Sequence, residues 1–99
     1  MDTDLIEAAK DGNLEVLELL LQQGANIDIQ NNNGNTALIW AARNDRLEVV
    51  KLLLQQGANP DLRDNHGSTF FDYLSQDNKK EFEEIIDVMS GIYIKGDPS

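Results

Sequence analysis

The residues best suited to chemistry are the single histidine, His66, and the two carboxylates that precede it, Asp61 and Asp64. A histidine beside carboxylates can bind a metal ion or act in acid–base catalysis. A zinc site needs several ligands in fixed geometry, and the sequence has no cysteine and no second histidine to complete one. His66 instead follows Asp64-Asn65 and precedes a glycine, a composition typical of a tight turn. We therefore interpret His66 as a turn residue and expect no metal and no cofactor.

The sequence contains no other catalytic pattern. If Gly34 were the glycine of a calcium-binding loop, the first ligand would be Ile29 and the last Trp40, and neither side chain binds calcium. The same test fails around Gly67. No serine has the Gly-x-Ser-x-Gly context of a nucleophile, and no glycine-rich phosphate loop is followed by Lys-Ser or Lys-Thr. The sequence thus predicts a protein that is not an enzyme.

The charge balance limits the class of partner. Eighteen acidic and eight basic side chains give a formal net charge of -10, which repels nucleic acids and anionic lipid surfaces. No apolar run approaches the length of a membrane span, and the absence of cysteine suits a reducing compartment. We expect a cytoplasmic monomer that binds a protein, with no nucleic acid and no membrane. The acidic field favours a partner with a basic surface, although acidic residues on a surface more often serve solubility.

The elements that would position these residues repeat along the chain. The stretch 21–26 returns unchanged as 54–59, and pairing residues 3–35 with 36–68 gives 19 identities in 33 pairs. A period of this length is typical of a stack of small units, each of which needs a neighbour to bury its apolar face. Function is then expected on a surface that several units build together.

Each unit is predicted to contain two helices joined by a tight turn. In the first unit Thr3 caps a helix that runs to about Lys10, and Asn13 caps a second helix that ends near Gly24. The predicted apolar stripe of this second helix comprises Val16, Leu17, Leu19, Leu20 and Leu21.

The second unit follows the same plan. After a turn at 31–34, a helix runs from Thr36 to Arg43 and another from Leu47 to Gln55, with Gly57 as its stop. Asp45 occupies the position of Gly12, and we expect it to adopt the same left-handed turn conformation.

The third unit departs from the period. A turn at 64–67 and a helix capped by Thr69 are expected, and then a last helix from Asn78 to Met89 that is amphipathic through Phe82, Ile85, Ile86 and Met89. The loss of apolar residues here is typical of a terminal unit with one face in water. The tail Gly91–Ser99 is predicted to fold back over the core through Ile92-Tyr93-Ile94, with a free strand that recruits a partner as the alternative.

Two segments carry a resemblance to a known family. Residues 36–41 read Thr-Ala-Leu-Ile-Trp-Ala, and both copies of Leu-Leu-Leu-Gln-Gln-Gly-Ala-Asn precede a turn and a Gly-x-Thr. In these features residues 2 to about 89 resemble ankyrin repeats, whose signature is Thr-Pro-Leu-His-x-Ala. Ile39 replaces the signature histidine, so apolar packing must substitute for its hydrogen bonds.

The resemblance implies an all-α repeat solenoid of ankyrin-type helix-turn-helix units joined by β-hairpin-like loops. We expect a single ankyrin repeat domain over residues 1–99. Its parts would be an N-terminal capping repeat (1–30), a full repeat (31–63), a C-terminal capping repeat (64–89) and a tail (90–99). The capped ends suggest a whole protein.

The resemblance also implies a non-catalytic protein-interaction module that binds a partner through a groove of loop tips and first helices. The variable positions expected to contact the partner are Asn32, Asn33, Asn35, Arg43, Asn44, Asn65, His66, Ser68, Gln76 and Asp77. Trp40 and Tyr73 occupy equivalent places in successive units. We interpret them as packing between units, with a binding role as the alternative.

A second function is also open at this point. A small acidic chain could be an inhibitor or immunity-type protein that neutralises a basic enzyme, such as a nuclease toxin, by occupying its cationic cleft. This reading predicts association that is steeply sensitive to salt.

Overall fold

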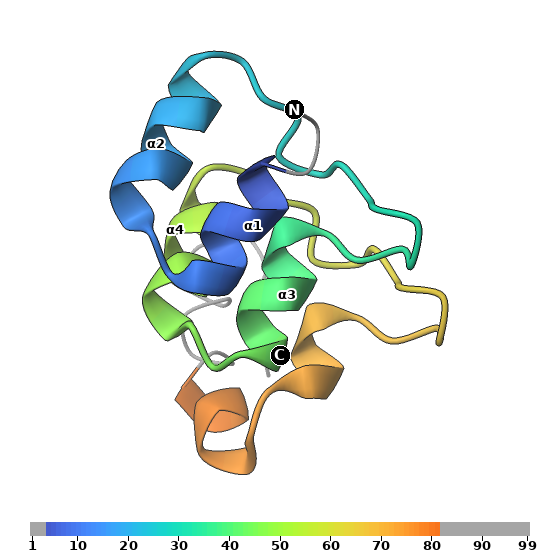
Figure 1. Cartoon of the computed structure of the whole chain (residues 1–99). Coiled ribbons are helices and arrows are strands. Elements are labelled where there is room, and N and C mark those ends of the chain that lie inside the picture. The colour runs from blue at the N-terminus through green and yellow to red at the C-terminus, as the bar shows by residue number, and fades with distance from the viewer. Residues whose placement is uncertain (1–3, 82–99) are drawn as a thin grey trace, which may run out of the picture.

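The computed structural model describes residues 4–81, and within them the chain forms a stack of helix pairs (Figure 1). The α-helices are α1 (Asp4–Asp11), α2 (Leu14–Gln22), α3 (Ala37–Arg43) and α4 (Leu47–Gln55), and a 3-10 helix, η1, spans Phe70–Tyr73. Residues 76–81 are also helical, and residues 4–81 contain no strand. The helical units predicted from the repeat are therefore confirmed.

The first helices of the three units, α1, α3 and η1, are the inner helices of the stack. They pack against one another because their facing side chains are small. Ala8 and Ala9 of α1 and Ala41 and Ala42 of α3 are all buried, and α1 contacts α3, which in turn contacts η1. Small side chains let helix backbones approach closely, so one continuous core runs through the stack. Ile39, which replaces the signature histidine, is buried in this core as expected.

The helix caps follow the sequence closely. Asn13 Oδ1 accepts a hydrogen bond from Val16 N (3.2 Å), and Thr36 Oγ1 accepts one from Ile39 N (3.1 Å). Asp45 has a φ of 56°, the left-handed conformation predicted from its equivalence to Gly12. The predicted cap Thr3 lies outside the described residues.

The two loops that separate the units end in tight tips. In each tip the glycine N–H donates to a carbonyl three residues earlier, at 2.9 Å, from Gly34 to Asn31 and from Gly67 to Asp64. The first and last residues of each loop are also paired, Asn31 N to Asn35 O and Asp64 N to Ser68 O. Both tips project from the same side of the stack (Figure 1).

The third unit differs from its prediction. Thr69 precedes a single turn of 3-10 helix, and Leu74 then adopts an extended conformation with ψ 146°. Ser75 Oγ accepts a hydrogen bond from Asn78 N (3.3 Å), so the next helix begins at residue 76, two residues earlier than predicted. The rest of the predicted helix, with Phe82, Ile85, Ile86 and Met89, and the predicted tail Gly91–Ser99 lie outside the described residues.

The predicted stripe of α2 is only partly right. Leu17 is buried, and Leu20 and Leu21 are half-buried, but Val16 is 40% exposed and Leu19 51% exposed. Val49 of α4, which is equivalent to Val16, is only 1% exposed because the first unit precedes it in the stack. The first unit has no such neighbour within residues 4–81, so part of its stripe remains at the surface.

Candidate functional site

A hollow lies where the two loop tips meet α3. Its lining side chains come from the first tip, from α3 and from the second tip: Asn33, Asn35, Trp40, Arg43, Asn65 and His66. Five of these six belong to the set predicted to contact a partner, and Trp40 is the sixth. The structure thus brings together side chains that are up to 33 residues apart in the sequence.

A row of cations and rings runs past this hollow. The Arg43 Cζ atom lies 4.8 Å from the centre of the Trp40 ring and 4.9 Å from the centre of the Tyr73 ring. The Lys10 Nζ atom lies 5.5 Å from the centre of the Trp40 ring. These distances are within the range of cation–π attraction.

The row repeats with the period of the sequence. Lys10 and Arg43 are equivalent residues, as are Trp40 and Tyr73, so the cation of one unit lies over the ring of the next unit twice. Both rings are half-buried and pack against the core. Packing between units is therefore confirmed for Trp40 and Tyr73, while part of each ring remains exposed.

The two tips are joined by hydrogen bonds between successive units. Asn65 N donates to Asn33 O (2.9 Å) and Asn65 Nδ2 to Asn32 O (3.0 Å). Gln30 Nε2 bridges Gly34 O (2.9 Å) and Arg63 O (3.0 Å). These bonds fix the position of one tip against the other, so the hollow is built in advance of any ligand.

A buried carboxylate organises the second tip. Asp64 Oδ1 accepts hydrogen bonds from His66 N (2.9 Å) and Ser68 N (3.1 Å), and Oδ2 accepts one from the Tyr73 hydroxyl. Burial raises the pKa of Asp64, but the bonds from Tyr73, Ser68 and His66 together outweigh it and lower that pKa below its ordinary value. The same bond to Asp64 raises the pKa of Tyr73. Asp64 is therefore a charged structural anchor for the tip and for Tyr73.

The predicted contact residues differ in what they present. Eight are exposed: Asn32, Asn33, Arg43, Asn44, Asn65, His66, Gln76 and Asp77. Ser68 is half-buried, and Asn35 is 1% exposed with its Oδ1 3.5 Å from Arg43 Nη1. Asn44 Nδ2 donates to Trp40 O at the end of α3 (2.9 Å).

Some predicted residues lie away from the hollow, and one contributor was missed. Gln76 and Asp77 lie at the start of the helical residues 76–81 and do not line the hollow. Lys10, which is not in the predicted contact set, contacts the Trp40 ring. The signal that could have found it is the basic residue at equivalent positions of two successive units, Lys10 and Arg43.

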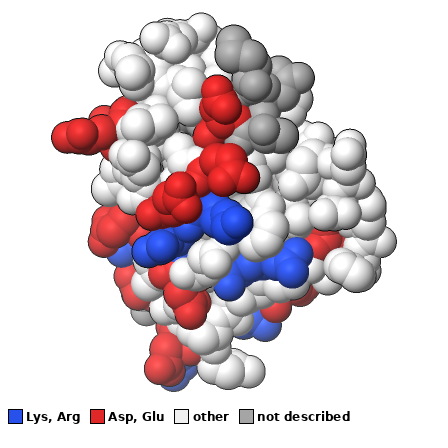
Figure 2. Space-filling view, in the orientation of Figure 1, with Lys and Arg blue, Asp and Glu red and all other residues white. Residues whose placement is uncertain are grey.

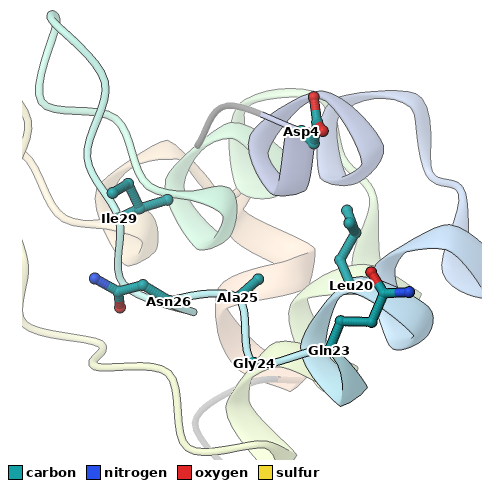
Figure 3. Close-up of a pocket in the computed structure, with 7 residues that line it drawn as sticks. All are labelled: Asp4, Leu20, Gln23, Gly24, Ala25, Asn26 and Ile29. Carbon is teal, nitrogen blue, oxygen red and sulfur yellow. The ribbon is translucent and has the colours of Figure 1, made fainter. Parts of the chain in front are cut away.

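A second hollow lies at the start of the stack, between the beginning of α1 and the end of α2 (Figure 3). The side chains of Leu20 and Ile29 extend from opposite sides of it, and Asp4, the first residue of α1, lies at its edge. Asp4 is the only titratable residue among those that line it. The lining mixes polar and apolar side chains, and none of its residues belongs to the predicted contact set.

Neither a metal centre nor a membrane span is found in the part of the chain that the structure describes. Within residues 4–81 no three His, Asp or Glu side chains are grouped as metal ligands would be. Each helix of that part is too short or too polar to cross a bilayer.

Comparison of the chain with protein-family models gives a match. The family model described as ankyrin repeats matches residues 3–90, in three copies. No curated protein matches the chain.

Proposed function

Since the chain belongs to the ankyrin repeat family, we propose that it is a non-catalytic interaction module that binds a partner protein along the face carrying the loop tips and the inner helices. Ankyrin repeats generally mediate protein–protein interactions and are typically non-catalytic. The binding face would include the hollow around Trp40 and the exposed side chains of both tips.

The observation that carries this proposal is that five of the ten predicted contact residues line one hollow. Asn33, Arg43, Asn65 and His66 are exposed there around a half-buried tryptophan. Tryptophan and arginine are the side chains most often found at energetic centres of protein interfaces. The hydrogen bonds between the tips reduce the ordering that binding would require, which supports affinity.

The proposal is tested by capture of partners from the native cell with variants of the tips. The double variant carries Asn33→Ala and His66→Ala. Both side chains are exposed, and within residues 4–81 only the backbone atoms of these two residues form hydrogen bonds. We expect this pair to reduce recovery of the captured protein severalfold. The matched control is Gln22→Ala with Gln55→Ala, on the exposed outer surface of α2 and α4, which should leave recovery unchanged. Equal losses from both pairs would refute binding along the tips.

The proposal includes an organisation and a place of action. We propose residues 1–30, 31–63 and 64–89 as the three units, with the first and last as caps and 90–99 as a tail. The chain would act as a monomer in the cytoplasm, which suits its lack of cysteine.

A second candidate is favoured by charge alone. With a net charge of -10, the chain could act as an inhibitor that neutralises a basic enzyme such as a nuclease toxin. Its acidic surface would then drive association, and affinity would fall steeply as salt is raised. Tight binding of a neutral partner that persists at high salt would refute this candidate and leave the first proposal in place.

A further inference from the structure

We propose that the hollow around Trp40 binds an aspartate or glutamate side chain of an extended acidic segment in the partner. This inference rests on the proposed function, because it names the chemistry of the partner at that same face. It is the reverse of what the net charge alone suggests.

The first argument is a local reversal of charge. Lys10 and Arg43 both lie against the Trp40 ring, and Arg46 is next to Lys10, because Arg46 Nε donates to Lys10 O (3.1 Å). Figure 2 shows Lys and Arg side chains together in the middle of this face of the molecule, with Asp and Glu mainly around them. In a chain with 18 acidic and eight basic residues, such a gathering is a distinct patch.

The second argument is that none of these cations forms an ion pair with a carboxylate of residues 4–81. Within residues 4–81 the ion pair found is Lys51 Nζ to Glu81 Oε2 at 2.9 Å, and it does not involve the patch. Lys10 and Arg43 instead contact aromatic rings. Ring contact leaves most of the five N–H donors of an arginine free to bind an acceptor, and a carboxylate is the acceptor that fits them best.

The third argument is the rigidity of the patch. Arg43 is held between the Trp40 and Tyr73 rings and lies 3.5 Å from Asn35 Oδ1 through Nη1. Tyr73 is held in turn by Asp64. A guanidinium fixed in this way loses little side-chain freedom on binding, so a single carboxylate is sufficient for selectivity. The exposed amide of Asn33 lies beside it to bind the peptide backbone.

The test uses the full chain and three acetylated and amidated peptides of the form Gly-X-Gly-X-Gly, with X as Glu, Gln or Lys. Amide chemical shifts and the emission of Trp40, the single tryptophan, are followed at physiological salt, where the Debye length is about 8 Å and the repulsion between net charges is largely screened. We expect the Glu peptide to cause saturable shifts at the two tips and the end of α3. The Gln peptide should bind more weakly and the Lys peptide should not bind there.

Two basic residues provide the matched variants. Arg43→Gln should weaken binding of the Glu peptide about fivefold, the loss expected from one exposed charge pair. Lys80→Gln changes the net charge equally but lies outside the hollow, and should leave the affinity unchanged. Because a cation in the last turn also stabilises its own helix, thermal unfolding checks each variant, and Lys10→Gln on α1 serves if Arg43→Gln fails to fold.

The outcomes separate this inference from the proposed function. Equal binding of the Glu and Gln peptides at the tips, or tighter binding of the Lys peptide, overturns the acidic partner but retains the face as a binding surface. Absence of shifts at the tips with the Glu peptide also overturns it. The proposed function is tested separately by partner capture: it fails when the tip variants leave recovery unchanged or reduce it no more than the control pair does.

Discussion

The outer helices α2 and α4 share most of their sequence but differ in burial. Both read Leu-Glu-Val at the start and Leu-Leu-Leu-Gln at the end. Val49 is 1% exposed whereas Val16 is 40% exposed, and Leu52 is half-buried whereas Leu19 is 51% exposed. The middle unit has a unit before it and the first unit has none within residues 4–81. In this stack the presence of a neighbouring unit, more than the residue type, decides whether a side chain is buried.

The two loop tips also differ in how closely a neighbouring unit packs against them. Gly34 and Gly67 have nearly the same φ, +80° and +81°. A Cβ at Gly34 would lie 2.8 Å from Asn65 N and 2.9 Å from Asp64 Cα, whereas a Cβ at Gly67 would meet nothing within 4 Å. The first tip is therefore packed by the second, and the second tip is open.

Substitution of the two tip glycines should give the largest contrast. Gly67→Ala places a side chain in a left-handed conformation and should cost about 1 kcal/mol of unfolding free energy. Gly34→Ala adds a clash with backbone atoms, so its total cost should be about 3 kcal/mol. Urea unfolding of both variants measures the difference, and equal losses would show that the tips do not pack as described.

The outer helices provide the second contrast. Val49→Ala removes buried methyl groups and should cost about 2 kcal/mol. Val16→Ala removes exposed ones and gains helix propensity, so the change should stay within about 0.5 kcal/mol. Similar large losses at both positions, measured by thermal or urea unfolding, would mean that another surface covers α2 in solution.

The third contrast concerns pH, because the first tip is built on neutral Asn31 and the second on Asp64. Asn31 Oδ1 accepts from Asn33 N and Asn35 N, just as Asp64 Oδ1 accepts from its own tip. Since the pKa of Asp64 is lowered on folding, the unfolded chain binds more protons in acid, and the carboxylate stabilises the fold in full above its unfolded pKa. That stability is lost as the pH falls from about 4 through the lowered value.

Asp64→Asn should therefore cost about 1 kcal/mol at neutral pH, the difference between a charged and a neutral acceptor. This difference from the wild type should narrow and vanish in acid, where Asp64 is protonated. Tyr73→Phe is the control, since loss of the hydroxyl should raise the pKa of Asp64 towards its ordinary value in a carboxyl NMR titration. A constant difference between wild type and Asp64→Asn from neutral pH to acid would contradict the assigned anchor.

Much of the fold could be predicted from the period of the sequence. The limits of α4, the cap Thr36 and the left-handed Asp45 follow from local propensities that repeat in each unit. The shortened third inner helix could not be predicted this way. Ser75 caps the next helix, and the inner helix therefore ends before it, with Leu74 in an extended conformation. This effect comes from residues that depart from the repeat, so the repeat does not predict it.

The sequence predicted where the site lies better than it predicted the contacts that its side chains make. Equivalent positions of the repeat placed Asn33, Arg43 and His66 on one face, and the structure brings them to one hollow. The burial of Asn35 and the row from Lys10 to Tyr73 depend on contacts between units. Such contacts arise only when two units are placed side by side, so the sequence of one unit does not reveal them.

The most direct test of the central claim is the emission of Trp40 while a captured, purified partner is titrated into the full chain. Trp40 is the single tryptophan of the chain and lies in the hollow between the tips and α3, so its emission reports on that face. The partner should lack tryptophan or carry a tryptophan analogue, so that the emission of Trp40 can be monitored selectively. As the complex forms, this emission should shift to the blue, and acrylamide should quench it less. Saturated binding that leaves both the emission and the quenching of Trp40 unchanged would contradict recognition along this face.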